Sequence, residues 1–98
     1  MGLDVRIVRV RKKNIDNNLT IKELYKKGVY VSEYRNTWDF INICNLSKKE
    51  KEDAICYRIL NDLPMYRLNI CGFESERLLE DSKNMDFDKF VYIVKADW

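Results

Sequence analysis

The strongest strand patterns lie at opposite ends of the chain. Leu3–Arg11 (LDVRIVRVR) and Phe90–Trp98 (FVYIVKADW) are rich in β-branched and aromatic residues and contain neither glycine nor proline. In the first segment the apolar residues occupy one face up to Ile7 and the other face from Val8 onward. This change of phase predicts a bulge or a strand covered on both faces. We expect the two segments to pair, so that the sheet closes a complete small protein.

A capping box marks the start of a short helix after the first strand. Thr20 and Glu23 form a T-x-x-E pattern, in which the two side chains satisfy free backbone N–H groups at a helix N-terminus. Gly28 is placed to stop this helix at its C′ position. Val29–Val31 is short and β-branched and predicts a brief strand.

A second capping box, formed by Ser47 and Glu50, predicts the longest helix, over Lys48–Asp62. Its apolar residues recur at helical spacing, and Pro64 follows the expected end. We also expect a helix over Glu33–Cys44, where aromatic and branched residues fall on one face.

The last third of the chain completes the pattern. Leu68, Ile70 and Phe73 predict a buried connector or strand closed by Gly72, and Glu74–Asp81 predicts a short acidic helix. The element order indicates a single α+β domain over residues 1–98. We expect a small, mainly antiparallel sheet that includes both terminal strands, packed with three to four helices.

Composition narrows the class of protein. The 98 residues are 46% hydrophobic, which suffices for one small core. No apolar run is long enough to span a bilayer, and no signal peptide is apparent, so we expect a cytoplasmic protein. The odd number of cysteines and their wide separation predict reduced thiols at Cys44, Cys56 and Cys71. Three scattered thiols make a zinc site improbable.

Histidine is absent, which excludes Ser-His-Asp, Cys-His and HExxH chemistry. We therefore expect a protein that is not an enzyme and needs no metal or cofactor. One alternative stays open: Asp4 and Asp97 would approach each other if the terminal strands pair, and two close carboxylates can serve acid–base catalysis.

Charge is unevenly distributed along the chain. Residues 1–51 carry twelve Lys/Arg and six Asp/Glu, whereas residues 52–98 carry six and ten. The first strand and its end hold a basic patch, which either follows a phosphate backbone or protects a sheet edge from unwanted pairing. Its members are Arg6, Arg9, Arg11, Lys12 and Lys13. The acidic residues between 74 and 88 indicate a solvated helix face, with nucleic-acid mimicry or a divalent cation as alternatives.

The densest group of recognition-type residues is Tyr34, Arg35, Asn36 and Trp38. Arginine supplies a planar fork of donors for carboxylate or phosphate, and Tyr and Trp supply flat apolar area with a polar tip. Such residues are frequent at binding hot spots. We predict that this group contacts a partner; the alternative is that Tyr34 and Trp38 belong to the core.

Several segments resemble a family of small uncharacterised bacteriophage and prophage proteins. The start MGLDVRIVRV is similar to the MGLDMYL-type opening of that family, and VSEYRNTW (Val31–Trp38) to its aromatic-Arg-Lys-x-Asn segment. ILNDLPMYRLNICGFESERLLEDSKN resembles the family's Leu-Pro turn, aromatic Gly segment and acidic helix, and FVYIVKADW its terminal strand. The resemblance spans most of the chain in order and implies a phage origin.

These observations lead to one functional hypothesis and two alternatives. We expect a non-enzymatic phage accessory protein in the host cytoplasm that binds a host protein or ribonucleoprotein stoichiometrically and inhibits a defence system, as an anti-CRISPR protein does. One alternative is a small-ligand module that binds a phosphorylated nucleotide signal through Arg35, and the other is a nucleic-acid-binding protein. A homodimer is also compatible with the sequence, and no membrane partner is expected.

Overall fold

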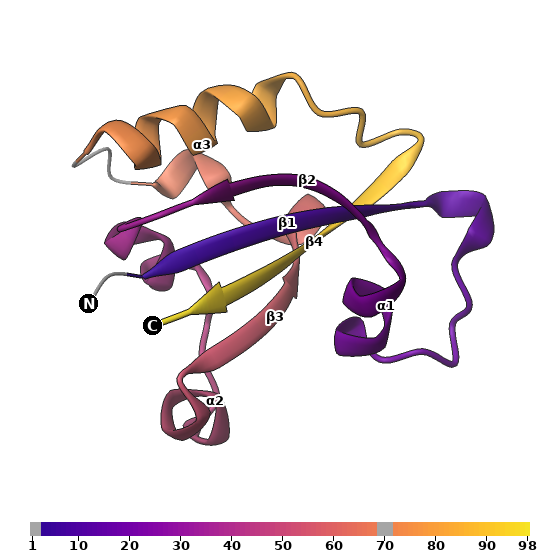
Figure 1. Cartoon of the computed structure of the whole chain (residues 1–98), viewed down its shortest axis with the longest axis horizontal. Helices are drawn as coiled ribbons and strands as arrows, with labels where there is room; N and C mark the ends of the chain where they lie inside the picture. The colour runs from indigo at the N-terminus through magenta and orange to yellow at the C-terminus, as the bar shows by residue number, and fades with distance from the viewer. Residues whose placement is uncertain (1–2, 69–71) are drawn as a thin grey trace.

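The computed structural model describes residues 3–68 and 72–98, whose centre is a four-stranded antiparallel sheet (Figure 1). Its strands are β1 (Asp4–Arg11), β2 (Val29–Tyr34), β3 (Ile55–Ile59) and β4 (Phe90–Asp97). Their order is β2-β1-β4-β3, so β2 and β3 form the two edges. The predicted α+β class with both terminal strands in the sheet is confirmed.

β1 and β4 form the middle of the sheet and pair along their whole length. The register runs from Asp4 opposite Asp97 to Arg11 opposite Phe90. In Figure 1 the two strands run side by side, flanked by β2 and β3. The predicted pairing of the two end segments is therefore confirmed, and it places the basic residues of β1 on an inner strand.

Three α-helices and four 3-10 helices connect the strands in the described part of the chain. The α-helices are α1 (Ile21–Lys27), α2 (Lys48–Asp53) and α3 (Phe73–Lys83). The 3-10 helices are η1 (Lys12–Asn14), η2 (Trp38–Ile43), η3 (Leu60–Asp62) and η4 (Met65–Arg67). Both predicted capping boxes form, at the starts of α1 and α2. The predicted acidic helix corresponds to α3. None of the helices described is long and apolar enough to cross a membrane.

The sheet is covered on both faces. The main core joins one face to α3 and includes Val5, Val94 and Leu78. A smaller core on the other face joins Val8 and Ile93 to α1. The register of β1 against β2 also shifts between Ile7 and Val8. The extra residue at this shift is Val31 of β2, whereas β1 pairs with β4 without interruption, so the change of phase in β1 reflects burial on both faces and not a bulge in β1.

The helix predicted over Lys48–Asp62 is wrong beyond Asp53. Ala54 adopts a left-handed conformation (φ 59°, ψ 21°), which ends α2 and turns the chain into β3. Residues Ile55 and Ile59 are four apart, a spacing that suits a helix face but also two pleats of a strand. Pairing with β4 decides between the two, because β3 buries Cys56 against the main core.

The helix predicted over Glu33–Cys44 is also wrong. Glu33 and Tyr34 continue β2, so the predicted brief strand begins at Val29 as expected but is longer. Asn36 then adopts a left-handed conformation (φ 58°), which no helix tolerates in its interior. Only the residues after Thr37 are helical, as η2.

Gly28 ends α1, but for a different reason from the one predicted. Its backbone is extended (φ −74°, ψ 160°) and not left-handed. A Cβ at this position would lie 2.8 Å from Cβ of Val8, so the residue is small because the chain passes close to β1. Of the predicted buried connector, Leu68 is buried, Ile70 lies outside the described residues, and Phe73 is exposed at the start of α3.

Candidate functional site

The structure separates the four residues predicted to contact a partner. Arg35, Asn36 and Trp38 are exposed, whereas Tyr34 is completely buried in the main core. The placement of Tyr34 in a contact surface is therefore wrong. Its position in β2 opposite Val5 directs its ring into the core, and the left-handed turn at Asn36 then brings the following residues to the surface.

Tyr34 instead joins β2 to α3. Its hydroxyl donates a hydrogen bond of 2.6 Å to Oδ2 of Asp81, and the guanidinium of Arg77 lies 4.4 Å from the centre of its ring. Arg77 also donates to the backbone oxygen of Glu33 at 2.7 Å. Burial, followed by the bond to Asp81, raises the pKa of Tyr34 to about 12. These contacts fix α3 over the sheet.

The Tyr34→Phe variant is expected to lose about 1–2 kcal/mol of folding free energy, because the bond to Asp81 disappears. The raised pKa makes a second prediction. The hydroxyl's contribution is fully present below its ordinary pKa of 10.0 and is lost as the pH rises through about 12. Urea unfolding at neutral and alkaline pH measures both effects, and the difference between wild type and variant should vanish near pH 12. Tyr66→Phe is the exposed control and should change neither measurement.

Hydrogen bonds on both sides of Trp38 hold its backbone in place. The backbone N–H and the hydroxyl of Thr37 both donate to the backbone oxygen of Leu3, at 2.9 and 3.0 Å. On the other side, the hydroxyl of Ser75 in α3 donates to Oδ1 of Asp39 at 2.6 Å. Thr37, Asp39 and Ser75 are all buried. Trp38 is therefore presented from a rigid junction between β1, η2 and α3.

Trp38 and Phe73 are exposed at this junction, and a third large aromatic side chain, Tyr66, is exposed in η4. We call Trp38, Tyr66 and Phe73 the aromatic surface. Their exposed fractions are 53%, 81% and 80%. The bond between Asp39 and Ser75 joins the residue after Trp38 to the first turn of α3, which Phe73 begins. Figure 1 shows η2 and the start of α3 at the same end of the molecule. Sequence reasoning missed Tyr66 and Phe73, because an exposed aromatic has the same pattern as a buried one.

The predicted basic patch is divided between the two faces of the sheet. Arg6 points to the face that carries α1, where it pairs with Glu33 at 3.8 Å and lies over the ring of Tyr30. Arg9 and Arg11 point to the opposite face, toward Phe90. The alternative that these charges protect a sheet edge is wrong, because β1 lies between β2 and β4.

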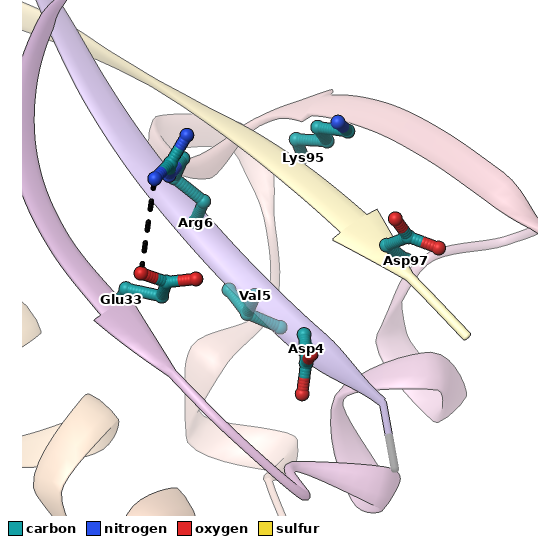
Figure 2. Close-up of a pocket in the computed structure, with 6 residues that line it drawn as sticks. All are labelled: Asp4, Val5, Arg6, Glu33, Lys95 and Asp97. Carbon is teal, nitrogen blue, oxygen red and sulfur yellow. Dashed lines mark ion pairs between the residues drawn. The ribbon is translucent and has the colours of Figure 1, made fainter. Parts of the chain in front are cut away.

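A cavity of about 200 Å³ lies where β1 and β4 bring Asp4 and Asp97 together (Figure 2). The two aspartates are register partners, as expected if the end segments pair. Figure 2 shows that their carboxylates do not point toward one another, and that Arg6 is engaged by Glu33. This arrangement lacks the close carboxylate pair that acid–base catalysis would need.

The two described cysteines lie inside the main core. Cys44 and Cys56 are 1% exposed and free, whereas Cys71 lies outside the described residues. The hydrogen bond with Cys56 and burial raise the pKa of the Cys44 thiol, which donates to the backbone oxygen of Phe40. A buried thiol with a raised pKa is a poor nucleophile. Within residues 3–68 and 72–98, no group of three or more potential ligands is placed to hold a metal ion.

The fold and its surfaces define an α+β domain with an exposed aromatic surface at one end and helices on both faces of an antiparallel sheet. Comparison with protein-family models, with curated proteins and with solved structures gives no match. The phage resemblance therefore stays a prediction.

Proposed function

We propose that this protein is a non-enzymatic phage accessory protein that binds a host protein or ribonucleoprotein stoichiometrically and thereby inhibits a defence system such as CRISPR–Cas. The observation that carries the proposal is the aromatic surface. Monomeric proteins seldom expose several large aromatic side chains together, and such patches mark protein–protein contacts. Tryptophan, tyrosine and arginine dominate the residues that contribute most to binding.

The surroundings of the aromatic surface support a protein partner. Arg35 and Arg67 are exposed beside Trp38 and Tyr66, and neither takes part in an ion pair within the described residues. An aromatic centre with free arginines at its rim fits a partner surface that carries apolar pockets and carboxylates. The hydrogen-bonded base of Trp38 reduces the entropy that binding must overcome, since the backbone is already fixed.

The double variant Trp38→Ala/Phe73→Ala is expected to lose at least about 2 kcal/mol of binding free energy, or roughly 30-fold in affinity, because both side chains lie in the proposed contact. Tagged wild-type and variant proteins would be used to capture proteins from a bacterial lysate. A partner bound in stoichiometric amount by the wild type should be lost with the variant. Expression of the wild type alone should then restore phage plating on a host that carries the targeted defence system.

Tyr30→Ala is the matched control, because Tyr30 is a similarly exposed aromatic on β2. It should retain the partner and the plating effect, and thermal unfolding should show that all three proteins are folded. The proposal fails if the double variant captures the same partner as the wild type. It also fails if a nucleotide or metabolite, and no protein, remains bound after gentle purification. If the partner is instead a second copy of this chain, sedimentation should show a dimer for the wild type and a monomer for the double variant.

A further inference from the structure

The end of β1 farthest from the aromatic surface carries a second surface, which we call the basic groove. It consists of six cationic residues from four segments: Arg9, Arg11, Lys12, Lys13, Lys27 and Lys89. Two cavities, of about 270 and 250 Å³, share Arg11 and together run along these residues. Asp88 is the one carboxylate that lines either cavity. We propose that the basic groove binds the sugar–phosphate backbone of a single-stranded nucleic acid.

The charges of the basic groove are not neutralised by ion pairs within the described residues. None of the ion pairs formed within residues 3–68 and 72–98 includes a member of the basic groove. The nearby carboxylate of Asp86 accepts hydrogen bonds from the backbone N–H groups of Asp88 and Lys89. Edge protection does not explain the arginines, since β1 is an inner strand. Six cations gathered beside the single carboxylate of Asp88 repel one another, so an external polyanion would stabilise them.

The two arginines of the basic groove, Arg9 and Arg11, are held in place and are still free to donate hydrogen bonds. The guanidinium groups of Arg9 and Arg11 lie 4.2 and 5.3 Å from the centre of the Phe90 ring. This cation–π contact orients both groups without using their N–H donors. Residues two apart on a strand are separated by about 6.6 Å, so the pair can reach different phosphates of one strand.

Flat and apolar surface beside the charges favours a nucleic acid over other polyanions, and a single strand over a duplex. The guanidinium groups that lie over the Phe90 ring, together with the exposed Val29, offer flat or apolar surface beside the charges. Bases stack on arginine planes and aromatic rings only when they are unpaired. Of the helices that contribute to the groove, η1 is a single turn and α1 contributes only its last residue, so neither presents a helix face to a major groove, whereas a groove of cations can follow an extended strand.

The basic groove is independent of the proposed protein contact. It lies at the other end of β1 from Leu3 and Thr37, and a strand of eight residues is about 25 Å long. Figure 1 shows η1, which carries Lys12 and Lys13, at the opposite end of the molecule from η2. One surface can therefore fail its test while the other passes.

Fluorescence anisotropy with a labelled oligo-dT or oligo-U tests the inference on the full chain. Contact with about four phosphates gives a slope of roughly −2.8 in log affinity against log salt, which is about a 50-fold loss between 50 and 200 mM salt. The double variant Arg9→Ala/Arg11→Ala should weaken binding at least about tenfold and reduce the slope by about 1.4. A duplex of the same length should bind more weakly than the single strand.

Two triple variants that lose the same amount of positive charge test whether binding occurs at the basic groove or through general attraction to the positive charge of the protein. Lys12→Gln/Lys13→Gln/Lys27→Gln removes three groove cations that are exposed, so the fold should be unaffected. Lys48→Gln/Lys49→Gln/Lys51→Gln removes three from α2. The first should weaken binding strongly and the second only slightly. Equal weakening, absence of binding at the lowest salt, or equally tight binding of duplex or inorganic polyphosphate would each overturn the proposal.

Discussion

The Arg58→Ala variant is expected to lose about 3 kcal/mol of folding free energy, which corresponds to a fall in Tm of about 12–20 °C for a domain of this size. Arg58 uses all its nitrogen atoms. It donates to both carboxylate oxygens of Glu50 and to the backbone oxygens of Cys44, Asn45 and Tyr57. Its removal leaves one carboxylate and three carbonyl groups without this partner, in a region that is only about one quarter exposed.

The same contact makes a prediction about pH. Hydrogen bonding to Arg58 lowers the pKa of Glu50 to about 2. The ion pair therefore stabilises the wild type fully above the ordinary pKa of 4.5, and this contribution is lost as the pH falls through about 2. Urea unfolding of wild type and variant should show a difference that is largest at neutral pH and shrinks in acid.

Two further variants serve as controls for Arg58. Arg58→Lys keeps the charge but cannot reproduce the planar fork of donors, so its loss should lie between those of wild type and alanine variant. Arg67→Ala removes an exposed arginine and should change stability by less than about 0.5 kcal/mol. If Arg58→Ala unfolds at the same urea concentration as Arg67→Ala, Arg58 does not stabilise the junction of η2, α2 and β3.

The Gly28→Ala variant is expected to lose about 2–3 kcal/mol of folding free energy. The added Cβ would lie 2.8 Å from Cβ of Val8 and closer still to its Cγ2. Val8 is buried on an inner strand, so neither backbone can move aside without disturbing the pairing with β2 or β4. The backbone angles of Gly28 suit alanine, which means that the loss comes from size alone.

A double-mutant cycle with Val8→Ala tests this cause. Because Val8→Ala removes the closest atom, the two substitutions together should cost less than the sum of their separate effects. Gly72→Ser is the control, since a Cβ there would meet nothing within 4 Å and serine suits a helix N-cap. Strict additivity, or a neutral Gly28→Ala, would show that α1 and β1 are not packed as described.

A structural element could be predicted from the sequence where the contacts that determine it lie within a few residues along the chain. Both capping boxes formed because Thr20 with Glu23, and Ser47 with Glu50, satisfy the backbone within one turn. The lengths of the helices were harder to predict. The end of α2 is decided by a left-handed Ala54, a conformation that alanine seldom adopts and that no local pattern indicates.

The residues of the candidate site also separate into those that residue type alone predicts and those that depend on contacts between distant segments. The exposed arginines and Trp38 could be named from residue type, but burial of Tyr34 depends on its pleat in β2 and on the register with Val5. The basic residues of β1 were predicted, whereas Lys27 and Lys89 join them only after the chain folds. A pattern along the sequence shows which chemistry is present, and the tertiary fold decides which residues meet.

The pairing of β1 with β4 has a consequence for synthesis. Asp4 and its partner Asp97 are among the earliest and latest of these residues to leave the ribosome, and the central ladder of the sheet joins them. A nascent chain therefore holds β1 without its main partner until translation has passed β4. Long-range pairing of this kind slows folding and leaves apolar strands open to chaperones in the interval. Assembly of the full sheet must then wait until β4 has left the ribosome, and truncation before β4 would remove the pairing partner of both β1 and β3.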